Sequence, residues 1–222
     1  GGPAVVVLDA GIATEENLKL IEAKGYKYLC VSRTKLKDYQ SVPDRLTVLM
    51  DTKSKQTIRL RSVTTEKNTD YYLEVKSPAK EKKEEGMKLQ FEKRFEDALQ
   101  KIHNALQGKG GVKKLHKVHQ RIGRAQEKYP SVQPYYIIEV SSDEKTNLAT
   151  AITWKKDETK HEQKNESLGI YFLRTNLKVQ DELVVWNIYN TIREIENAFR
   201  ALKTDLDLRP VYHKMMMLPW SG

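Results

Sequence analysis

The sequence holds a single cysteine, Cys30, among its 222 residues. One thiol forms no intramolecular disulfide and cannot supply the several thiolates of a structural zinc site, so both kinds of scaffold are excluded. Because Cys30 lies in the apolar segment 26–31, we interpret it as a small buried hydrophobic residue. A chain without disulfides is typical of the cytosol.

Long apolar runs are also missing. No stretch approaches the roughly 20 residues that a helix needs to cross a bilayer, and no signal-peptide pattern is present. We therefore expect no membrane-spanning segment. No internal period is visible either, so the sequence does not indicate a repeat architecture.

Acidic residues are outnumbered by basic ones. The 39 Lys and Arg residues against 30 Asp and Glu residues give a formal net charge of +9 and a pI near 9.4. This balance favours a polyanionic partner, and nucleic acid is the commonest one. A length of 222 residues suits one large globular domain, or one domain that carries an insertion.

The first 42 residues predict a strand, a helix and a second strand. Residues 4–8 form a short apolar run that ends at Asp9, Thr14 is a good N-cap for a helix, and Gly25 suits the position after its end. Residues 26–32 predict the next strand. This order predicts two parallel strands, so we expect Asp9 at the carboxyl end of a parallel strand, where open α/β sheets place ligands.

The middle of the chain has a different pattern. Strand-like segments lie at 46–50, 57–63 and 71–75, helices are predicted at 80–106 and 112–128, a hairpin at 135–140 and 148–154, and a charged stretch at 155–167. A core strand at 170–173 and a final helix at 181–203 follow. We therefore predict a mixed α+β fold of the α/β type, in which residues 1–42 and 168–222 form the core and residues 43–167 form a β-rich and helical insertion.

The final predicted helix has two parallel stripes. The apolar stripe contains Ile188, Ile192, Ile195, Phe199 and Leu202. Each of these is followed by a polar or charged residue, namely Tyr189, Arg193, Glu196, Arg200 and Lys203. At about 100° per residue this second stripe places Glu196 between basic residues one turn away on either side. A solvated helix face with ion pairs has the same pattern.

Three parts of the chain resemble a known family: residues 7–26, 172–176 and 189–213. Tyr189, Glu196 and Lys203 resemble the C-terminal signature of the DDE transposases of bacterial insertion sequences, in which a Tyr–Arg–Glu–Lys motif surrounds the last catalytic acid. Asp9 lies in a segment that resembles the one around the second acid. The combination of these segments, in this order, is more specific than any of them alone.

The resemblance implies an RNase H-like catalytic domain that cuts and joins DNA at transposon ends, a reaction of DNA recombination. It implies that Asp9 and Glu196 are catalytic and hold Mg²⁺ or Mn²⁺ in a two-metal site, because hard oxygen ligands suit these ions. The stripe residues expected on DNA phosphate are Tyr189, Arg193, Arg200 and Lys203. The parent protein is expected to be bacterial, cytoplasmic and nucleoid-associated, and to act as a homodimer on DNA.

Two departures from the family pattern change these expectations. Ile192 occupies the position of the signature arginine, and Arg193 is the nearest substitute on the stripe. Only eight residues precede Asp9, too few for the strand that would contain the first aspartate. We therefore expect a C-terminal fragment of a longer transposase, which binds metal weakly and is inactive alone.

A second basic segment runs from Lys109 to Lys128, with Glu127 as its one acidic residue. We predict a helix that contacts DNA phosphate through Lys114, Lys117 and Arg121, with an ordinary solvated face as the alternative. For the whole chain, one alternative is a non-catalytic nucleic-acid-binding remnant that keeps the RNase H-like scaffold. The other is an α/β domain whose basic face binds a protein.

Overall fold

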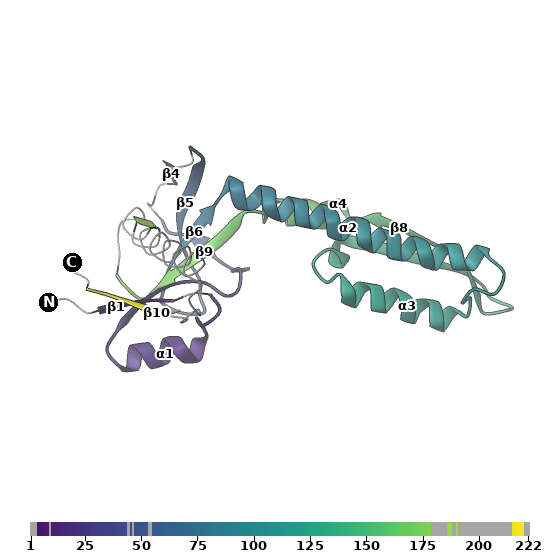
Figure 1. Ribbon diagram of the computed structural model, residues 1–222, viewed down its shortest axis with the longest axis horizontal. Coiled ribbons are helices and arrows are strands. Elements are labelled where there is room, and N and C mark those ends of the chain that lie inside the picture. Colours follow the sequence, from purple (N-terminus) through teal and green to yellow (C-terminus); the bar gives the residue numbers. More distant parts are fainter. Residues whose placement is uncertain are drawn as a thin grey trace, which may run out of the picture. The chain divides into compact units, whose positions relative to one another are not determined.

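The computed structural model describes residues 4–8, 10–43, 45, 47–52, 55–178, 186–187, 190 and 215–219. The chain divides into two compact units (Figure 1). Unit 1 comprises residues 1–78 and 170–222, and unit 2 comprises residues 79–169. Helices and strands occur in both units, so the predicted mixed α+β class is confirmed.

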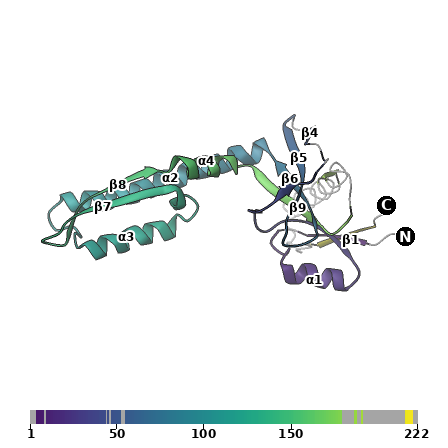
Figure 2. The same cartoon turned by 180° about the vertical axis from the view of Figure 1, so that it is seen from behind.

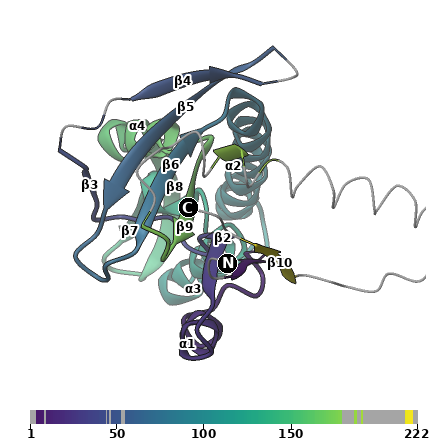
Figure 3. The ribbon, with the colours of Figure 1, turned by 90° about the vertical axis from the view of Figure 1, so that its left-hand side faces the viewer.

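Unit 1 is built on a mixed sheet with eight described strands (Figure 3). The strands are β1 (Ala4–Leu8), β2 (Lys27–Val31), β3 (Gln40–Ser41), β4 (Val48–Asp51), β5 (Thr57–Thr64), β6 (Tyr71–Lys76), β9 (Ile170–Thr175) and β10 (Met215–Pro219). Their order is β10-β1-β2-β9-β6-β5-β3, and β4 also pairs with β5. Only β1 and β2 run parallel to each other, and the other described pairs are antiparallel.

The predicted strand–helix–strand unit is confirmed. Helix α1 (Glu15–Ala23) connects β1 to β2, and the Thr14 side chain caps it by accepting a hydrogen bond from the Asn17 N–H at 3.1 Å. Gly25 adopts a positive φ of 80°, which glycine tolerates without steric cost. Leu8 is the register partner of Cys30, so β1 and β2 end at the same edge of the sheet. Asp9 follows Leu8 at that edge but lies outside the described residues.

Each face of β1 packs into a different apolar cluster. Val5 and Val7 belong to the cluster that also contains Leu29 of the adjacent strand β2, Leu173 of β9 and Leu73 of β6. Val6 and Leu8 belong to the cluster beneath α1. Because successive side chains of a strand alternate between faces, a continuous apolar run indicates a strand covered on both sides. The buried run at 5–8 therefore holds the sheet and α1 together.

The boundaries of the inserted segment differ from those predicted. Strands β4, β5 and β6 lie within the predicted insertion 43–167, yet they extend the sheet that contains β1 and β2. Strand β6 pairs with β9 along its whole length, from Tyr71 opposite Thr175 to Lys76 opposite Ile170. Unit 2 begins only at residue 79. Strand patterns predict that a segment pairs but not with which partner, and this pairing joins residues about a hundred positions apart.

Unit 2 places two helices on one face of a two-stranded hairpin (Figure 2). Its elements are α2 (Pro78–Gln107), α3 (Leu115–Lys128), the 3-10 helix η1 (Gln133–Tyr135), β7 (Tyr136–Asp143), β8 (Leu148–Lys156) and α4 (Glu158–Glu166). Phe95 and Leu99 of α2, Val118 of α3 and Ile152 of β8 are buried together. The predicted helices and hairpin are thus confirmed, although α3 begins three residues later than predicted.

Helix α4 lies in the stretch that we predicted only as charged sequence. It buries none of its residues, so it has no apolar periodicity from which a helix could be predicted. Its one local signal is Asp157, whose carboxylate accepts a hydrogen bond from the Lys160 N–H at 3.0 Å and caps the helix.

Within the described ranges, every helix is too short or too polar to span a membrane.

Candidate functional site

The predicted catalytic pair, Asp9 and Glu196, lies outside the part of the chain that the structure describes. The same holds for the stripe residues expected on DNA phosphate, Tyr189, Arg193, Arg200 and Lys203. Of the predicted final helix, only residues 186–187 and 190 are described, and they are helical. Within the described ranges, no three His, Cys, Asp or Glu side chains form a group that could hold a metal ion. The metal site therefore stays a prediction.

The predicted basic residues of the segment from Lys109 to Lys128 lie together on α3 and at its N-cap, Lys114. Lys114, Lys117, Arg121, Arg124 and Lys128 are all exposed and form what we call the α3 basic stripe. Their spacing of three, four, three and four residues keeps them within an arc of about 80° on the helix surface. The apolar side of α3, with Val118, Ile122 and Ala125, packs into the core of unit 2.

The start of α3 is fixed to the hairpin. Lys114 forms a β-bridge with Leu148, and the Lys113 carbonyl accepts a hydrogen bond from the Ala149 N–H at 2.7 Å. Together with the buried apolar side, this anchor sets the rotation of the helix about its axis. The basic stripe is therefore held in one orientation within unit 2.

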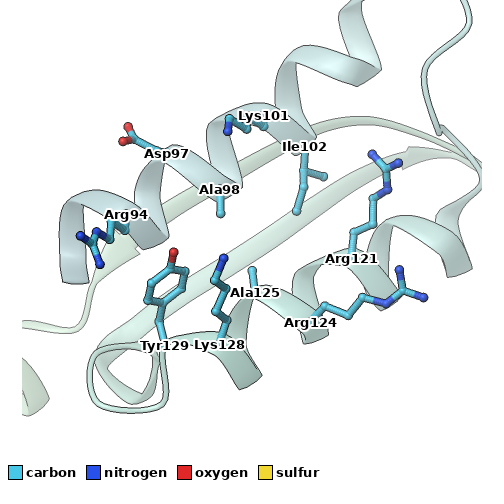
Figure 4. Close-up of a pocket in the computed structure, with 10 residues that line it drawn as sticks. All are labelled: Arg94, Asp97, Ala98, Lys101, Ile102, Arg121, Arg124, Ala125, Lys128 and Tyr129. Carbon is cyan, nitrogen blue, oxygen red and sulfur yellow. The ribbon is translucent and has the colours of Figure 1, made fainter. Parts of the chain in front are cut away.

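A groove between α2 and α3 adds a second row of basic residues. It has a volume of about 450 Å³ and opens to solvent (Figure 4). Its lining residues are Arg94, Asp97, Ala98, Lys101 and Ile102 of α2, Arg121, Arg124, Ala125 and Lys128 of α3, and Tyr129. We call this feature the α2–α3 groove. It shares three cations with the α3 basic stripe, while Lys114 and Lys117 lie outside it.

The charges of the groove are unbalanced. Five cations line it against one acid, Asp97. Among the described residues, none of the five cations has an acidic partner within 4.0 Å. The Nζ atom of Lys128 lies 5.8 Å from the ring centroid of Tyr129, over the ring face. Like charges on facing helices repel each other, and a bound anion would relieve that repulsion.

The sequence did not identify the α2 side of this groove. Arg94 and Lys101 are seven residues apart, so they lie on the same side of α2 two turns from each other. Their spacing alone does not tell which element that side faces, because α2 is rich in charged residues all along its length. Only the packing of α2 against α3 brings Arg94 and Lys101 opposite the basic stripe.

A buried ionic cluster lies elsewhere in unit 2. The Glu92 side chain is 6% exposed and accepts hydrogen bonds from Tyr135 Oη at 2.8 Å and from Lys156 Nζ at 2.7 Å. Lys88 Nζ lies 3.4 Å from Glu92 Oε1 and 2.9 Å from His161 Nε2. Burial alone would raise the pKa of the Glu92 carboxyl, but the hydrogen bonds from Lys156 and Tyr135 bring that pKa below its ordinary value.

This cluster holds elements together. It joins α2, η1, β8 and α4, and Lys88 Nζ also donates a hydrogen bond to Asn165 Oδ1 of α4 at 2.5 Å. Because α4 buries no side chain of its own, these polar contacts fix it to unit 2. Every ionisable group of the cluster is engaged with another, so we interpret it as structural.

Unit 1 contains a similar cluster around Arg174. Its guanidinium donates to Asp70 Oδ2 at 2.6 Å and forms an ion pair with Glu15 of α1, and Tyr28 Oη donates to the same Asp70 oxygen. Burial opposes the charge of Arg174, but the hydrogen bonds to Glu15 and Asp70 outweigh it and raise the pKa of Arg174. The cluster ties α1 to β2 and β9 and gives no indication of a ligand.

Comparison of the chain with protein-family models, with curated proteins and with solved structures finds no match.

Proposed function

We propose that this chain binds DNA through the α3 basic stripe and belongs to the catalytic part of a DDE transposase. The stripe is the observation on which the proposal depends. Its five exposed cations share one side of a helix, and within the described part of the chain they have no acidic partners. Such a row attracts a polyanion, because phosphates that bind to it release their condensed counterions.

The length of the stripe also suits a nucleic acid. Lys114 and Lys128 are 14 residues apart, which corresponds to about 21 Å at 1.5 Å per residue. Phosphates of one strand follow each other every 3.4 Å or so along the DNA axis, so the stripe matches about six nucleotides. Contacts of this kind fix position on the duplex but do not specify a sequence.

The transposase part of the proposal depends on the resemblance of the two ends of the chain. It is supported by the parallel pair β1–β2, because Asp9 directly follows Leu8 at the edge where such strands end. The cutting and joining of DNA, and the Mg²⁺ or Mn²⁺ ions that it needs, enter the proposal through the resemblance alone. Residues Asp9 and Glu196 are the acids that we assign to that reaction.

The salt dependence of DNA affinity tests the binding. For the triple variant Lys114→Gln, Lys117→Gln and Arg121→Gln, we expect the slope of log K against log salt to fall by up to about 2.7, at about 0.9 per lost phosphate contact. A control variant removes the same charge from exposed lysines elsewhere in unit 2: Lys145→Gln, Lys155→Gln and Lys160→Gln. An equal loss in the control, or no DNA retardation by the unaltered chain at low salt, would refute binding by the stripe.

Cleavage by the full-length protein tests the catalytic part. We expect Asp9→Asn and Glu196→Gln to abolish metal-dependent nicking of a transposon-end duplex while DNA retardation is unchanged. Glu194→Gln is the matched control, because Glu194 points to another side of the predicted helix. If the full-length protein retards DNA but nicks none with Mg²⁺ or Mn²⁺, the non-catalytic alternative is correct.

A further inference from the structure

The α2–α3 groove differs from the α3 basic stripe in its chemistry. Both of its sides carry cations, Arg94 and Lys101 on α2 and Arg121 and Arg124 on α3 (Figure 4). Between them the lining is apolar, formed by the half-buried Ala98 and by Ile102 and Ala125, which are 7% and 9% exposed. Tyr129 completes the lining. The groove thus offers charge along both sides and an apolar strip between them.

These two properties suit different parts of one ligand. The cations match phosphates, and the apolar strip matches a flat hydrophobic surface. A DNA duplex presents phosphates on its outside but hides the faces of its bases by stacking. A single strand presents both, and proteins that bind single strands combine a basic groove with aromatic side chains on which bases stack.

The size of the groove agrees with this choice. Packed helices lie about 8–10 Å apart, so the strip between α2 and α3 is too narrow to admit a duplex. A volume of about 450 Å³ lies in the range of small-ligand sites, and a few nucleotides of strand suffice to fill it.

We propose that the α2–α3 groove binds a single strand of nucleic acid, with its phosphates on the two basic sides and a base against the apolar strip and Tyr129. The inference rests on the proposed DNA binding and deepens it. It assigns single-stranded nucleic acid to the α2–α3 groove, beside the α3 basic stripe that we propose for duplex DNA. The outer residues of the stripe, Lys114 and Lys117, would remain available to the backbone of a duplex.

Two variants that remove the same charge separate the two surfaces. The groove variant is Arg94→Gln with Lys101→Gln, and the stripe variant is Lys114→Gln with Lys117→Gln. All four side chains are exposed, so both variants should keep the fold. The probes are a fluorescein-labelled oligothymidine and a labelled duplex of the same length, and the measurement is fluorescence anisotropy with the whole chain at one fixed low salt concentration.

We expect the groove variant to lose about tenfold in affinity for oligothymidine and much less for the duplex. The stripe variant should lose affinity mainly for the duplex. Tyr129→Leu keeps an apolar side chain beside Phe91 and Phe95 but removes the stacking ring, so it should weaken oligothymidine binding at least fivefold and leave the duplex unaffected.

The outcomes distinguish this inference from the proposed function. If neither probe binds, both fail. If the duplex binds and the stripe variant weakens it, but the groove variant affects both probes equally or neither, only the groove inference is overturned. Inorganic phosphate and polyglutamate serve as competitors at matched charge. If either displaces oligothymidine as well as unlabelled oligothymidine does, the groove is a general anion site and the inference is wrong.

Discussion

Replacement of Glu92 by glutamine tests how unit 2 is held together. The substitution keeps the size of the side chain and removes its negative charge, which leaves the ammonium group of Lys88 without its counter-ion. Lys88 is 6% exposed and cannot be hydrated in place, whereas Lys156 is one-third exposed and can. Removal of one partner from a buried ion pair costs about 3–5 kcal/mol, and the exposure of Lys156 puts the expected loss near the lower end, at about 3 kcal/mol.

The assay is urea denaturation near neutral pH, combined with hydrogen exchange in peptides from α2 and α4. Those peptides report on unit 2 separately from unit 1. A second substitution, Lys88→Met in the Glu92→Gln background, removes the unpaired buried charge and should restore much of the lost free energy of unfolding. A loss below about 1 kcal/mol, or no recovery in the double variant, would show that the cluster is not a buried ionic contact.

Acidification should remove the contribution of the Glu92 cluster to the free energy of unfolding. The pKa of Glu92 is lower in the folded chain than its ordinary value of 4.5. A carboxyl of this kind contributes its full stability above its unfolded pKa and loses that contribution as the pH falls through its folded pKa. The difference in unfolding free energy between the unaltered chain and Glu92→Gln should therefore be constant above about pH 5 and shrink below it. A difference that grew on acidification would contradict the assigned direction of the shift.

Three further predictions concern packing. A Cβ on Gly111 would lie 1.9 Å from the Ala105 carbonyl oxygen, so Gly111→Ala should destabilise the chain by about 1–3 kcal/mol in thermal denaturation. Its control Gly123→Ala, mid-helix with open space, should stabilise by up to about 1 kcal/mol. Burial raises the pKa of Cys30 to about 12, so a thiol reagent near pH 8 should modify it only after unfolding. Leu99→Ala, in the core of unit 2, should cost about 2–5 kcal/mol by urea denaturation.

Local signals explain how much of the fold could be predicted. The β1–α1–β2 unit was predictable because its cap at Thr14, its glycine at position 25 and its apolar runs all lie within about 30 residues of one another. The partner of β6 was not predictable, because β9 lies about a hundred residues further along the chain. Pairing across such a distance leaves no trace in the pattern of either strand, so the sequence alone predicts an insertion that begins at residue 43 and not at residue 79.

The candidate site also has a part that could be predicted from the sequence and a part that could not. The α3 basic stripe could be predicted, since its spacing lies within one helix and needs no knowledge of neighbours. The α2–α3 groove could not be predicted. Arg94 and Lys101 become part of a basic site only because they line the same groove as cations of α3. Charged residues on a surface helix are normally solvated. Sequence alone therefore cannot tell which charged residues of α2 lie near the cations of α3.

One signal in α2 was present in the sequence and was missed. The buried side of α2 consists of Lys88, Glu92, Phe95, Leu99, Ile102 and Leu106. These residues recur at intervals of four, three, four, three and four, so both charged residues are in register with the apolar stripe. Leu89, an apolar residue of the same helix, is out of register and 55% exposed. In a helix the register decides burial, and a charged pair on a core register must find partners inside the fold. Lys156 and His161, supplied from β8 and α4 more than sixty residues later, are those partners.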